Sequence, residues 1–462
     1  MATPVIDGFR LEKKIHEGGM ATIWSVTRPD LTMPLVMKIP FMRHGEAPET
    51  IVGFEVERMI LARLTGIHVP RFVATGDFDQ PYIVMEHVPG ISLLTRLPDA
   101  PLPPDEVATI GATVATALHD IHRQRVIHHD VKPSNVIMHP AGHATLIDFG
   151  FARHELLPDL LAEEIHGPVG TGPYVSPEQL ALNRSDPRSD LFAVGVILYF
   201  LATGERPFGD PVRLRDWRRR LWRDPVPPRQ RRPNVPPWLQ EIILRCLELD
   251  PKARHPSAAA LADDLRHPGQ VALTARAERV ARDPLGLVAV RWLRSRRRPV
   301  PPREPERTRP SLVMLAVDLT PGREALSDAL RAAVRRALVT DPAARLACVN
   351  VLKLSRLANE PSEDEQGRNL HLRRLAELKR WARALGIEGD RITYHVLESP
   401  DPAGALLEFG RASGVDHLVM GARASSTLRR YLGSVSSQVV AEAPCTVTVV
   451  RAPADPARDG TR

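Results

Sequence analysis

The sequence predicts two domains of different class: a two-lobed α+β domain, followed by an α/β domain with a doubly wound, five-stranded parallel sheet. Three observations lead to this prediction. The chain has 462 residues, which is too long for one ordinary core. An Arg- and Pro-rich stretch, RSRRRPVPPREPERTRP, begins at Arg294 and interrupts the globular pattern. Before this stretch, short apolar runs are followed by a long region of helical periodicity, whereas after it strand and helix patterns alternate.

The N-terminal part divides into a β-rich lobe and a helical lobe. Residues 9–90 contain short apolar runs separated by turn residues, with one helical stretch between Pro48 and Leu64. Helical periodicity dominates from Pro104 to about Leu265. The apolar run LFAVGVILYFLATG, which begins at Leu191, is shorter than a membrane span and predicts a buried core helix.

The C-terminal part alternates between strand and helix patterns after Ser311. Its five apolar runs are LVMLAV, RLACVNVL, ITYHVL, DHLVMG and TVTVV, and a helical stretch separates each from the next. Strands that alternate with helices imply a parallel sheet covered on both faces. We therefore expect a first domain over residues 1–267, a basic Pro/Arg-rich linker over 268–310, a second domain over 311–452 and a flexible tail over 453–462.

Two features of the linker region and of the charge distribution allow more than one interpretation. The stretch TARAERVARDPLGLVAVRWL, residues 274–293, is either a helix that packs on the preceding lobe or a basic amphipathic helix. The net charge is +7, and arginines at 218–220, at 229–232 and at 294–298 carry much of it. We interpret these clusters as solvated loop and linker surface rather than a polyanion site, so no nucleic-acid partner is expected.

The remaining composition is that of a soluble intracellular protein. The three cysteines are odd in number and widely spaced, which argues against a disulfide framework and a zinc site. No secretory signal and no apolar run of about 18 residues is visible. We expect a cytoplasmic protein without a membrane span.

Several motifs together suit phosphoryl transfer, which requires a cover over the triphosphate, a cation on its oxygens, metal ligands and a carboxylate at the acceptor. The segment IHEGGMATI, residues 15–23, predicts a hairpin in which Gly18 and Gly19 allow the backbone to approach phosphates. Lys38 lies in the apolar strand VMKI, where an unpaired ammonium is costly. Glu57, on the following helical stretch, is the best candidate for its partner.

The strongest motifs are IHHDVKPSNVI and LIDFG, whose separation suits a short hairpin between them. Asp130 is the candidate that accepts the proton of the acceptor hydroxyl, and Lys132 the candidate that neutralises the transferring phosphoryl group. Asn135 and Asp148 are the candidate magnesium ligands.

On these motifs, residues 9–267 resemble the eukaryotic-type (Hanks-type) serine/threonine protein kinases of bacteria. The resemblance implies the bilobal protein kinase fold, ATP with Mg²⁺ or possible Mn²⁺ as cofactors, and protein substrates. It implies that the carbonyl of Glu86 and the amide of Val88 meet adenine, behind Met85. The implied ATP-binding residues are Ile15, His16, Glu17, Gly18, Gly19, Met20, Ala21, Thr22, Ile23, Lys38, Glu86 and Val88.

Other landmarks of this family give structural expectations. Glu178 in SPEQ is expected to pair with Arg254 in DPKARHP, and Asp190 is expected to steady the loop around Asp130. Lys132 is the form found in serine/threonine kinases, so tyrosine is the less favoured acceptor.

The sequence also departs from the family pattern. His16 and Ala21 replace two of the three loop glycines, and His129 replaces the arginine that precedes the catalytic aspartate. The segment FGFARHELLPDLLAEEIHGPVG contains no Ser, Thr or Tyr before Thr171. We therefore predict activity that does not depend on phosphorylation of this segment. His129 is either a pH sensor or a histidine packed into a polar cluster.

The C-terminal part contains LAVD at the end of its first strand, the segment VMGARASSTLRRYLGSVSSQVV and the closing strand APCTVTVVR. On these segments, residues 311–452 resemble the universal stress protein family, some of whose members bind ATP. Asp318, Gly421, Gly433 and Ser434 match the nucleotide-binding pattern, but Ala424 replaces a second glycine. The possible second nucleotide site is therefore either functional or a degenerate, structural copy. The closing strand TVTVV offers an edge for a homodimer, so this domain is a candidate sensor or dimerisation module.

The preferred function is transfer of the ATP γ-phosphate to serine or threonine of proteins. Two alternatives stay open: an ATP-binding pseudokinase scaffold, suggested by His16 and Ala21, and an adenine-nucleotide stress sensor in which the first domain is only the output.

Overall fold

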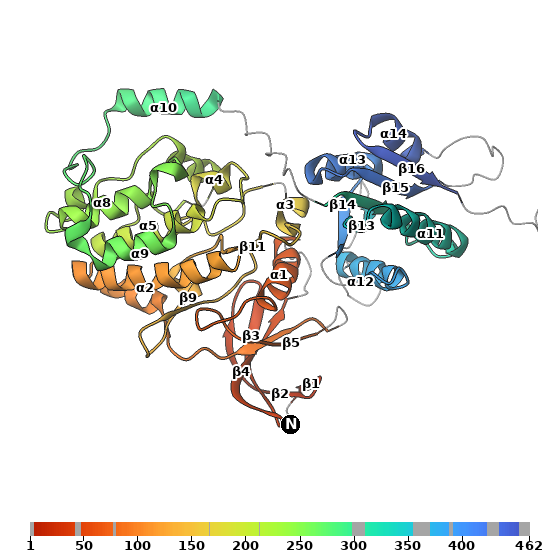
Figure 1. Cartoon of the computed structure of the whole chain (residues 1–462), viewed down its shortest axis with the longest axis horizontal. Helices are drawn as coiled ribbons and strands as arrows, with labels where there is room; N and C mark the ends of the chain where they lie inside the picture. Colours follow the sequence, from red (N-terminus) through yellow and green to blue (C-terminus); the bar gives the residue numbers. More distant parts are fainter. Residues whose placement is uncertain are drawn as a thin grey trace, which may run out of the picture.

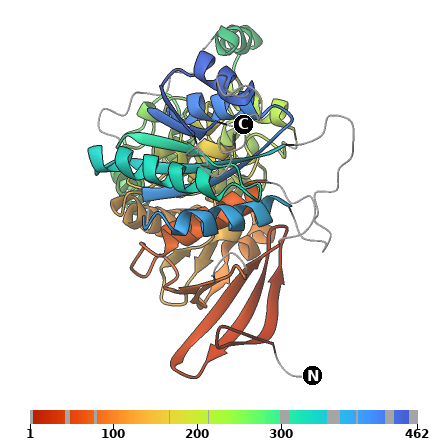
Figure 2. The ribbon, with the colours of Figure 1, turned by 90° about the vertical axis from the view of Figure 1, so that its right-hand side faces the viewer.

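The computed structural model describes residues 4–41, 48–76, 80–165, 167–211, 213–297, 310–353, 370–387, 391–422 and 434–451. Figure 1 shows two domains, of which the N-terminal one has a strand lobe and a helical lobe. Figure 2, turned by 90°, looks onto the C-terminal domain, whose sheet and flanking helices lie in front of the helical lobe. Both predicted fold classes are confirmed.

The strand lobe is a curled antiparallel sheet with helix α1 (Pro48–Leu61) beside it. Its strands follow the order β1-β2-β3-β4-β6-β5. They are β1 (Val5–Ile6), β2 (Phe9–Glu17), β3 (Ala21–Arg28), β4 (Leu31–Pro40), β5 (Phe72–Thr75) and β6 (Ile83–Glu86). Neighbouring residues of a strand point to opposite faces. Leu35 and Met37 thus pack on the outer side with Phe9, whereas Val36 joins the core shared with α1. Lys38 has the same parity as Val36 and faces α1.

The helical lobe is built around α5, which is buried over most of its length because its sequence is apolar on all sides. Helices α2 and α8 pack against α5, and α9 packs against α2. The helices are α2 (Pro104–Arg123), α3 (Leu160–Glu164), α4 (Pro177–Leu180), α5 (Arg188–Thr203), α6 (Leu214–Trp217), α7 (Pro228–Arg231), α8 (Pro237–Cys246) and α9 (Ala258–Arg266), with 3₁₀ turns at Leu93–Asp99, Pro133–Asn135, Arg218–Leu221, Pro251–Ala253 and Pro268–Gln270.

Short strands outside the six-stranded sheet bring two loops together. They are β7 (Ile91–Ser92), β8 (Val126–Ile127), β9 (Val136–Met138), β10 (Ala144–Leu146) and β11 (Arg153–His154). Strands β9 and β10 pair antiparallel, with Val136 opposite Leu146. This register places the loop before β9 beside the loop after β10, and the amide of Ile147 donates to the carbonyl of Asn135 at 3.0 Å. The predicted hairpin between the two motifs is therefore present.

Residues 268–297, which composition assigns to the linker, begin on the helical lobe in the structure. The side-chain amide of Gln240 donates to the carbonyl of Arg276 at 2.7 Å, and the Arg276 guanidinium lies 3.0 Å from Glu241. Helix α10 (Leu285–Arg297) follows, and Arg291 pairs with Asp224 of the lobe at 2.9 Å. Polar contacts thus hold part of this stretch on the lobe. Residues 298–309 of the linker and the tail 453–462 lie outside the described residues.

The C-terminal domain has a parallel sheet in the order β14-β13-β12-β15-β16. Val313 and Leu315 of β12 face α11 and α12, whereas Leu312 and Met314 face α13 and α14, so both faces are buried as predicted. The strands are β12 (Leu312–Ala316), β13 (Arg345–Lys353), β14 (Ile392–Ser399), β15 (His417–Gly421) and β16 (Thr446–Val450), and the helices are α11 (Glu324–Thr340), α12 (Leu370–Arg383), α13 (Pro402–Ser413) and α14 (Ser434–Glu442).

Candidate active site

The glycine hairpin joins β2 to β3 and is closed by a backbone hydrogen bond. The amide of Gly18 donates to the carbonyl of Ala21 at 3.0 Å. A side chain at Gly18 would lie 3.3 Å from Nε2 of His16, whereas Gly19 is surrounded by open space. His16 therefore lies against its own turn, and the backbone at Gly19 remains open to a phosphate-sized group.

Lys38 lies between two carboxylates that come from different parts of the chain. Its Nζ is 2.5 Å from Oε2 of Glu57 on α1 and 2.9 Å from Oδ1 of Asp148, which follows β10. The Glu57 side chain is only 2% exposed, whereas that of Asp148 is 42% exposed. The predicted Lys38–Glu57 ion pair is therefore present, and Asp148 completes a charged cluster with one open side.

The protonation states of this cluster follow from burial and from mutual attraction. Burial alone lowers the pKa of Lys38, but the carboxylates of Asp148 and Glu57 raise it well above its ordinary value. Burial works against ionisation of Asp148, but Lys38 lowers its pKa to about 2. Burial raises the pKa of Glu57 despite the attraction of Lys38. Lys38 is thus a cation and Asp148 an anion at neutral pH.

Asp130 is the centre of a second polar cluster. Its Oδ2 accepts from Nζ of Lys132 at 2.6 Å and from Nδ2 of Asn135 at 3.1 Å. Its Oδ1 accepts from the hydroxyl of Thr171 at 2.7 Å. Nζ of Lys132 also donates to the hydroxyl of Thr171 at 3.0 Å. The structure thus brings together the three residues predicted in DVKPSN, and Thr171 from a distant segment joins them.

Asp190, near the start of α5, fixes the backbone of the loop that carries Asp130. Its carboxylate accepts from the amides of His128 and His129 at 2.9 and 2.8 Å, and Nε2 of His122 lies 2.8 Å away. Burial opposes its ionisation, but the contact with His122 lowers its pKa to about 2. The expected support of the loop by Asp190 is present.

Asp159 is a second anchor of the segment between Asp148 and Glu178, in addition to Thr171. Asp159 accepts from Nε of Arg184 at 3.0 Å, and Nε of Arg153 lies 3.6 Å from the same carboxylate. Asp159 also caps α3, because its side chain accepts from the amide of Ala162 at 3.2 Å. Burial raises the pKa of Asp159, but the two arginines lower it overall. A permanent negative charge therefore lies between these cations.

His129 is buried in the same region and packs rather than titrates. Its Nε2 donates to the carbonyl of Arg184 at 2.9 Å. Burial and the nearby Arg184 guanidinium lower its pKa to about 3. The side chain is neutral at physiological pH, so the structure favours the packed histidine over the pH sensor.

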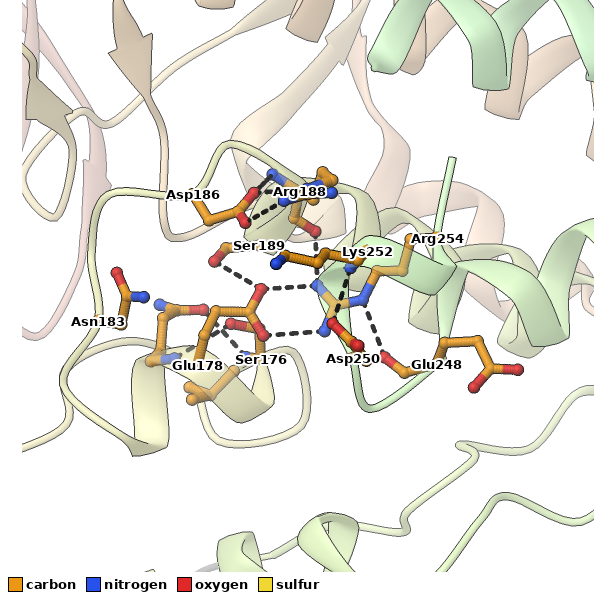
Figure 3. A network of polar contacts seen from close by, with 12 residues as sticks. Ser176, Glu178, Asn183, Asp186, Arg188, Ser189, Glu248, Asp250, Lys252 and Arg254 are labelled. Atoms are coloured by element: carbon orange, nitrogen blue, oxygen red, sulfur yellow. Dashed lines mark hydrogen bonds and ion pairs between the residues drawn. The ribbon is translucent and has the colours of Figure 1, made fainter. Parts of the chain in front are cut away.

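Two buried arginines hold the end of the segment. The guanidinium of Arg254 binds both carboxylate oxygens of Glu178 at 2.6 and 2.8 Å, as predicted, and the hydroxyl of Ser189 donates to the same carboxylate at 2.8 Å (Figure 3). Arg220 donates to the carbonyl of Gly172 at 2.7 Å and to that of Val175. Arg220 is only 4% exposed, so it is not part of the solvated arginine surface that composition suggests.

The candidate adenine-contacting residues lie at the end of strand β6 and directly after it. Met85 is 7% exposed and packs in the core. The amide of Glu86 donates to the carbonyl of Arg71 and that of His87 to the carbonyl of Pro34, both at 2.9 Å. These bonds fix the chain that leads to Val88, which is half-buried.

The candidate second nucleotide site is organised locally. Asp318 follows β12 and accepts from the amide and hydroxyl of Thr320 at 3.1 and 2.6 Å, and it pairs with Arg323. Gly421 ends β15, and a side chain there would lie 2.9 Å from Leu326. Ser434 begins α14, whereas Gly433 and Ala424 lie outside the described residues. Two of the partners of the Asp318 carboxylate thus belong to its own turn, and the choice between a functional nucleotide site and a degenerate, structural copy stays a prediction.

Sequence reasoning missed Asp159, Arg184 and Arg220. The pattern DLLAEE does contain a helix-capping aspartate, so a cap at Asp159 could have been inferred. Its pairing with Arg184 over 25 residues had no signal in spacing or composition.

Comparisons with known proteins agree with this geometry. Residues 9–265 match the model of the protein kinase domain family, and residues 312–451 match that of the universal stress protein family. The chain is 32% identical over 282 residues to the serine/threonine-protein kinase PknB of Mycobacterium leprae, covering 58% of this chain and 45% of that protein. It is 35% identical over 276 residues to the serine/threonine-protein kinase pkn3 of Myxococcus xanthus, covering 56% of this chain and 49% of that protein.

A solved structure is also similar. The kinase domain of Mycobacterium tuberculosis PknI is 25% identical, with a TM-score of 0.45, and the match covers 58% of this chain and 99% of that one. The present chain spans about half the length of the curated relatives PknB and pkn3.

Proposed function

Because the chain belongs to the protein kinase domain family, whose members generally use ATP and Mg²⁺, we propose that it transfers the γ-phosphoryl group of ATP to serine or threonine of protein substrates. The single observation that carries this proposal is the convergence on Asp130. Lys132, Asn135 and Thr171 all bind its carboxylate, close to where a substrate hydroxyl must lie for in-line transfer.

The residues of the cluster divide the work of the reaction. Asp130 orients the acceptor hydroxyl and takes its proton while the hydroxyl oxygen bonds to the γ-phosphorus and the bond from that phosphorus to the bridging oxygen breaks. Lys132 offsets the negative charge of the transferring group. Lys38, held by Glu57, contacts the α and β phosphates, while Gly18 and Gly19 cover the triphosphate. Glu86 and Val88 meet adenine.

The side chains available for magnesium fit that ion. Asp148 is a partly exposed anion, and Asn135 contributes an amide oxygen from the adjoining loop. Mg²⁺ prefers oxygen ligands and uses one or two protein side chains together with substrate phosphates. Among the described residues, no cluster of three or more His, Cys, Asp or Glu side chains offers an all-protein metal site, which agrees with such a shared site. When bound, the ion neutralises the phosphate oxygens.

Phosphorylation of the segment 148–178 is not required in this proposal. Asp159 already supplies a negative charge between Arg153 and Arg184, where a phosphate would otherwise order the segment. Thr171 is the first hydroxyl-bearing residue after Asp148, and its hydroxyl is bound to Asp130. The control of activity therefore comes from elsewhere in the chain.

The C-terminal domain serves as a sensor or dimerisation module in this proposal. Strand β16 is one edge of its sheet, which supports a homodimer through that strand.

Every described helix is too short or too polar to cross a membrane. We place the kinase in the cytoplasm.

The test is phosphate transfer to a generic protein substrate by the purified full chain with Mg-ATP or Mn-ATP, beside an Asp130→Asn variant. Transfer well above that variant is the expected result. ATP binding without transfer above the Asp130→Asn level would instead favour the pseudokinase scaffold, which His16 beside Gly18 suggests. Tight ATP binding that survives Lys38→Met would favour a nucleotide sensor in the C-terminal domain.

A further inference from the structure

Helix α1 carries two glutamates that point in different directions. Successive residues of an α-helix are rotated by about 100°, so Glu55 and Glu57 lie about 200° apart around the axis. Glu57 faces inward and binds Lys38 at 2.5 Å. Glu55 faces the C-terminal domain, where Nζ of Lys379 on α12 lies 3.3 Å from its carboxylate. One helix therefore connects the candidate catalytic cluster with the second domain.

The contact between α1 and the C-terminal domain has an apolar centre. Ile51 lies one turn before Glu55 and packs with Leu375 of α12 and Val396 of β14. Each of these three side chains is at most 5% exposed. Lys379 is also held over the ring of Tyr394, at 5.0 Å from its centroid. The outer face of α1 is thus covered by apolar contacts as well as by a salt bridge, and a cavity of about 350 Å³ lies between α1 and the C-terminal domain.

Helix α3 of the segment 148–178 makes a second contact with the same domain. Glu163 lies 3.4 Å from the guanidinium of Arg345 and 3.4 Å from Nε2 of His395. Glu164 lies 2.8 Å from Nδ1 of His395, which is fully buried. Helix α3 also packs against α1 and α13, and Figure 1 shows it on the side of the N-terminal domain that faces the C-terminal domain.

The charges across this interface are complementary. The N-terminal domain contributes the carboxylates of Glu55, Glu163 and Glu164. The C-terminal domain contributes the cations Lys379 and Arg345, and the imidazole of His395 is a hydrogen-bond partner of Glu164. Complementary charge around a packed apolar centre is what a specific interface requires.

We propose that the C-terminal domain is an intramolecular positioning element, which docks on α1 and α3 and thereby holds Glu57 on Lys38 and the segment 148–178 in the arrangement that contacts Asp130. This inference rests on the proposed kinase function. Docking of the C-terminal domain is then the input that replaces phosphorylation of the segment 148–178. Helix α3 is fixed at its start by Asp159 and at its end by the C-terminal domain. Glu55, Lys379, Glu163, Glu164, Arg345 and His395 act through Glu57 and Thr171 and are positioning residues.

The charges at Glu55 allow a matched test, because Glu55 binds Lys379 and also Arg58, at 2.8 Å. In Lys379→Glu, two carboxylates face each other at the interface. In the double variant Glu55→Lys/Lys379→Glu, a cation at position 55 again faces an anion at position 379. The net charge of positions 55, 58 and 379 together is the same as in the natural chain. A cavity of about 350 Å³ adjoins Lys379, so the new side chains have room. Lys379→Met removes the charge without creating repulsion, and Arg336→Glu changes an exposed charge on α11.

The experiment measures phosphate transfer by each full-length variant, together with hydrogen exchange of residues 48–61 and 160–164. We expect Lys379→Glu to lower kcat by about tenfold and to speed exchange in both helices. The double variant should regain transfer to within about threefold of the natural chain. Lys379→Met and Arg336→Glu should stay within about twofold, because the apolar centre remains intact.

Three results would overturn the inference. Unchanged transfer and exchange in Lys379→Glu would show that docking does not support the site. Faster transfer in Lys379→Glu would show that the domain restrains the kinase instead. Equal losses in the single and double variants would show that the effect does not pass through this pair.

Failure of the proposed function remains distinguishable from failure of this inference. If the natural chain transferred no phosphate, the proposed function would fail, while hydrogen exchange would still show whether the C-terminal domain holds α1 and α3.

Discussion

Asp148 and Asp318 both follow a strand, yet the two domains use these carboxylates differently. Asp148 pairs with Lys38 across 110 residues of sequence and keeps 42% of its side chain exposed. Asp318 binds Thr320 and Arg323, which lie two and five residues away. Both side chains are partly exposed, so the two carboxylates differ in the sequence distance of these partners and not in exposure. This difference separates the candidate active site from the candidate nucleotide site of the C-terminal domain.

The largest expected effect comes from replacing each aspartate by asparagine. Asp148→Asn should lower phosphate transfer by about a thousandfold, because it removes the anionic magnesium ligand and the partner of Lys38. Asp318→Asn should leave transfer unchanged. Initial rates with a generic protein substrate measure both. A large loss in Asp318→Asn would break the comparison and make the C-terminal site part of the mechanism.

The cations beside the two carboxylates sharpen the same contrast. Lys38→Met should lower transfer by about a hundredfold, because the triphosphate loses its positioning ammonium. Arg323→Met, the matched change beside Asp318, should stay within about twofold. ATP titration of each variant then shows where nucleotide binds. Loss of ATP affinity only in Lys38→Met would place the nucleotide in the N-terminal domain, and loss only in Arg323→Met would contradict that.

A third contrast concerns stability. Arg254 is fully buried against Glu178, so Arg254→Met leaves a buried carboxylate without its cation and should lower the free energy of unfolding by about 3 kcal/mol. Arg323→Met removes a pair that is partly exposed and should cost less than about 1 kcal/mol. Urea unfolding of the full chain, followed separately for the two domains, measures both. Equal losses would mean that Glu178 finds another partner.

The smallest expected effect concerns pH. Because burial and Arg184 lower the pKa of His129 to about 3 from 6.5, the native state keeps the imidazole neutral while the unfolded state binds a proton below about pH 6.5. The contribution of His129 to the free energy of unfolding therefore falls as pH drops from about 6.5 to 3, and it is constant above that range. His129→Gln should flatten this part of the stability profile and leave the pH dependence of transfer above pH 7 unchanged. A shifted transfer profile would restore His129 as a pH sensor.

The sequence predicts those parts of the molecule that depend on local pattern. The uniform apolarity of β12 and of α5 specifies their burial, and these elements appear as expected. The motifs around Lys38, Asp130 and Asp148 predicted candidate residues that the structure gathers into two polar clusters. Arg220 could not be found, because it lies in an arginine run that resembles solvated surface, and only packing shows that it binds carbonyls.

The contacts between domains were also beyond sequence reasoning. Glu55 and Lys379 are separated by 324 residues, and each has the composition of an ordinary surface charge. Their contact depends on how the β14 side of the C-terminal sheet packs against α1 of the N-terminal domain. No local sequence pattern encodes this packing. The same holds for His395 and Glu164, which are 231 residues apart.

The most direct test of the central claim is autophosphorylation of the purified full chain with Mg-ATP, beside Lys38→Met and Asp130→Asn, followed by mass-spectrometric mapping of the modified residues. The account predicts phosphate on serine or threonine in the natural chain and none above background in either variant. Absence of phosphate in the natural chain with ATP still bound, or equal incorporation in Asp130→Asn, would contradict it.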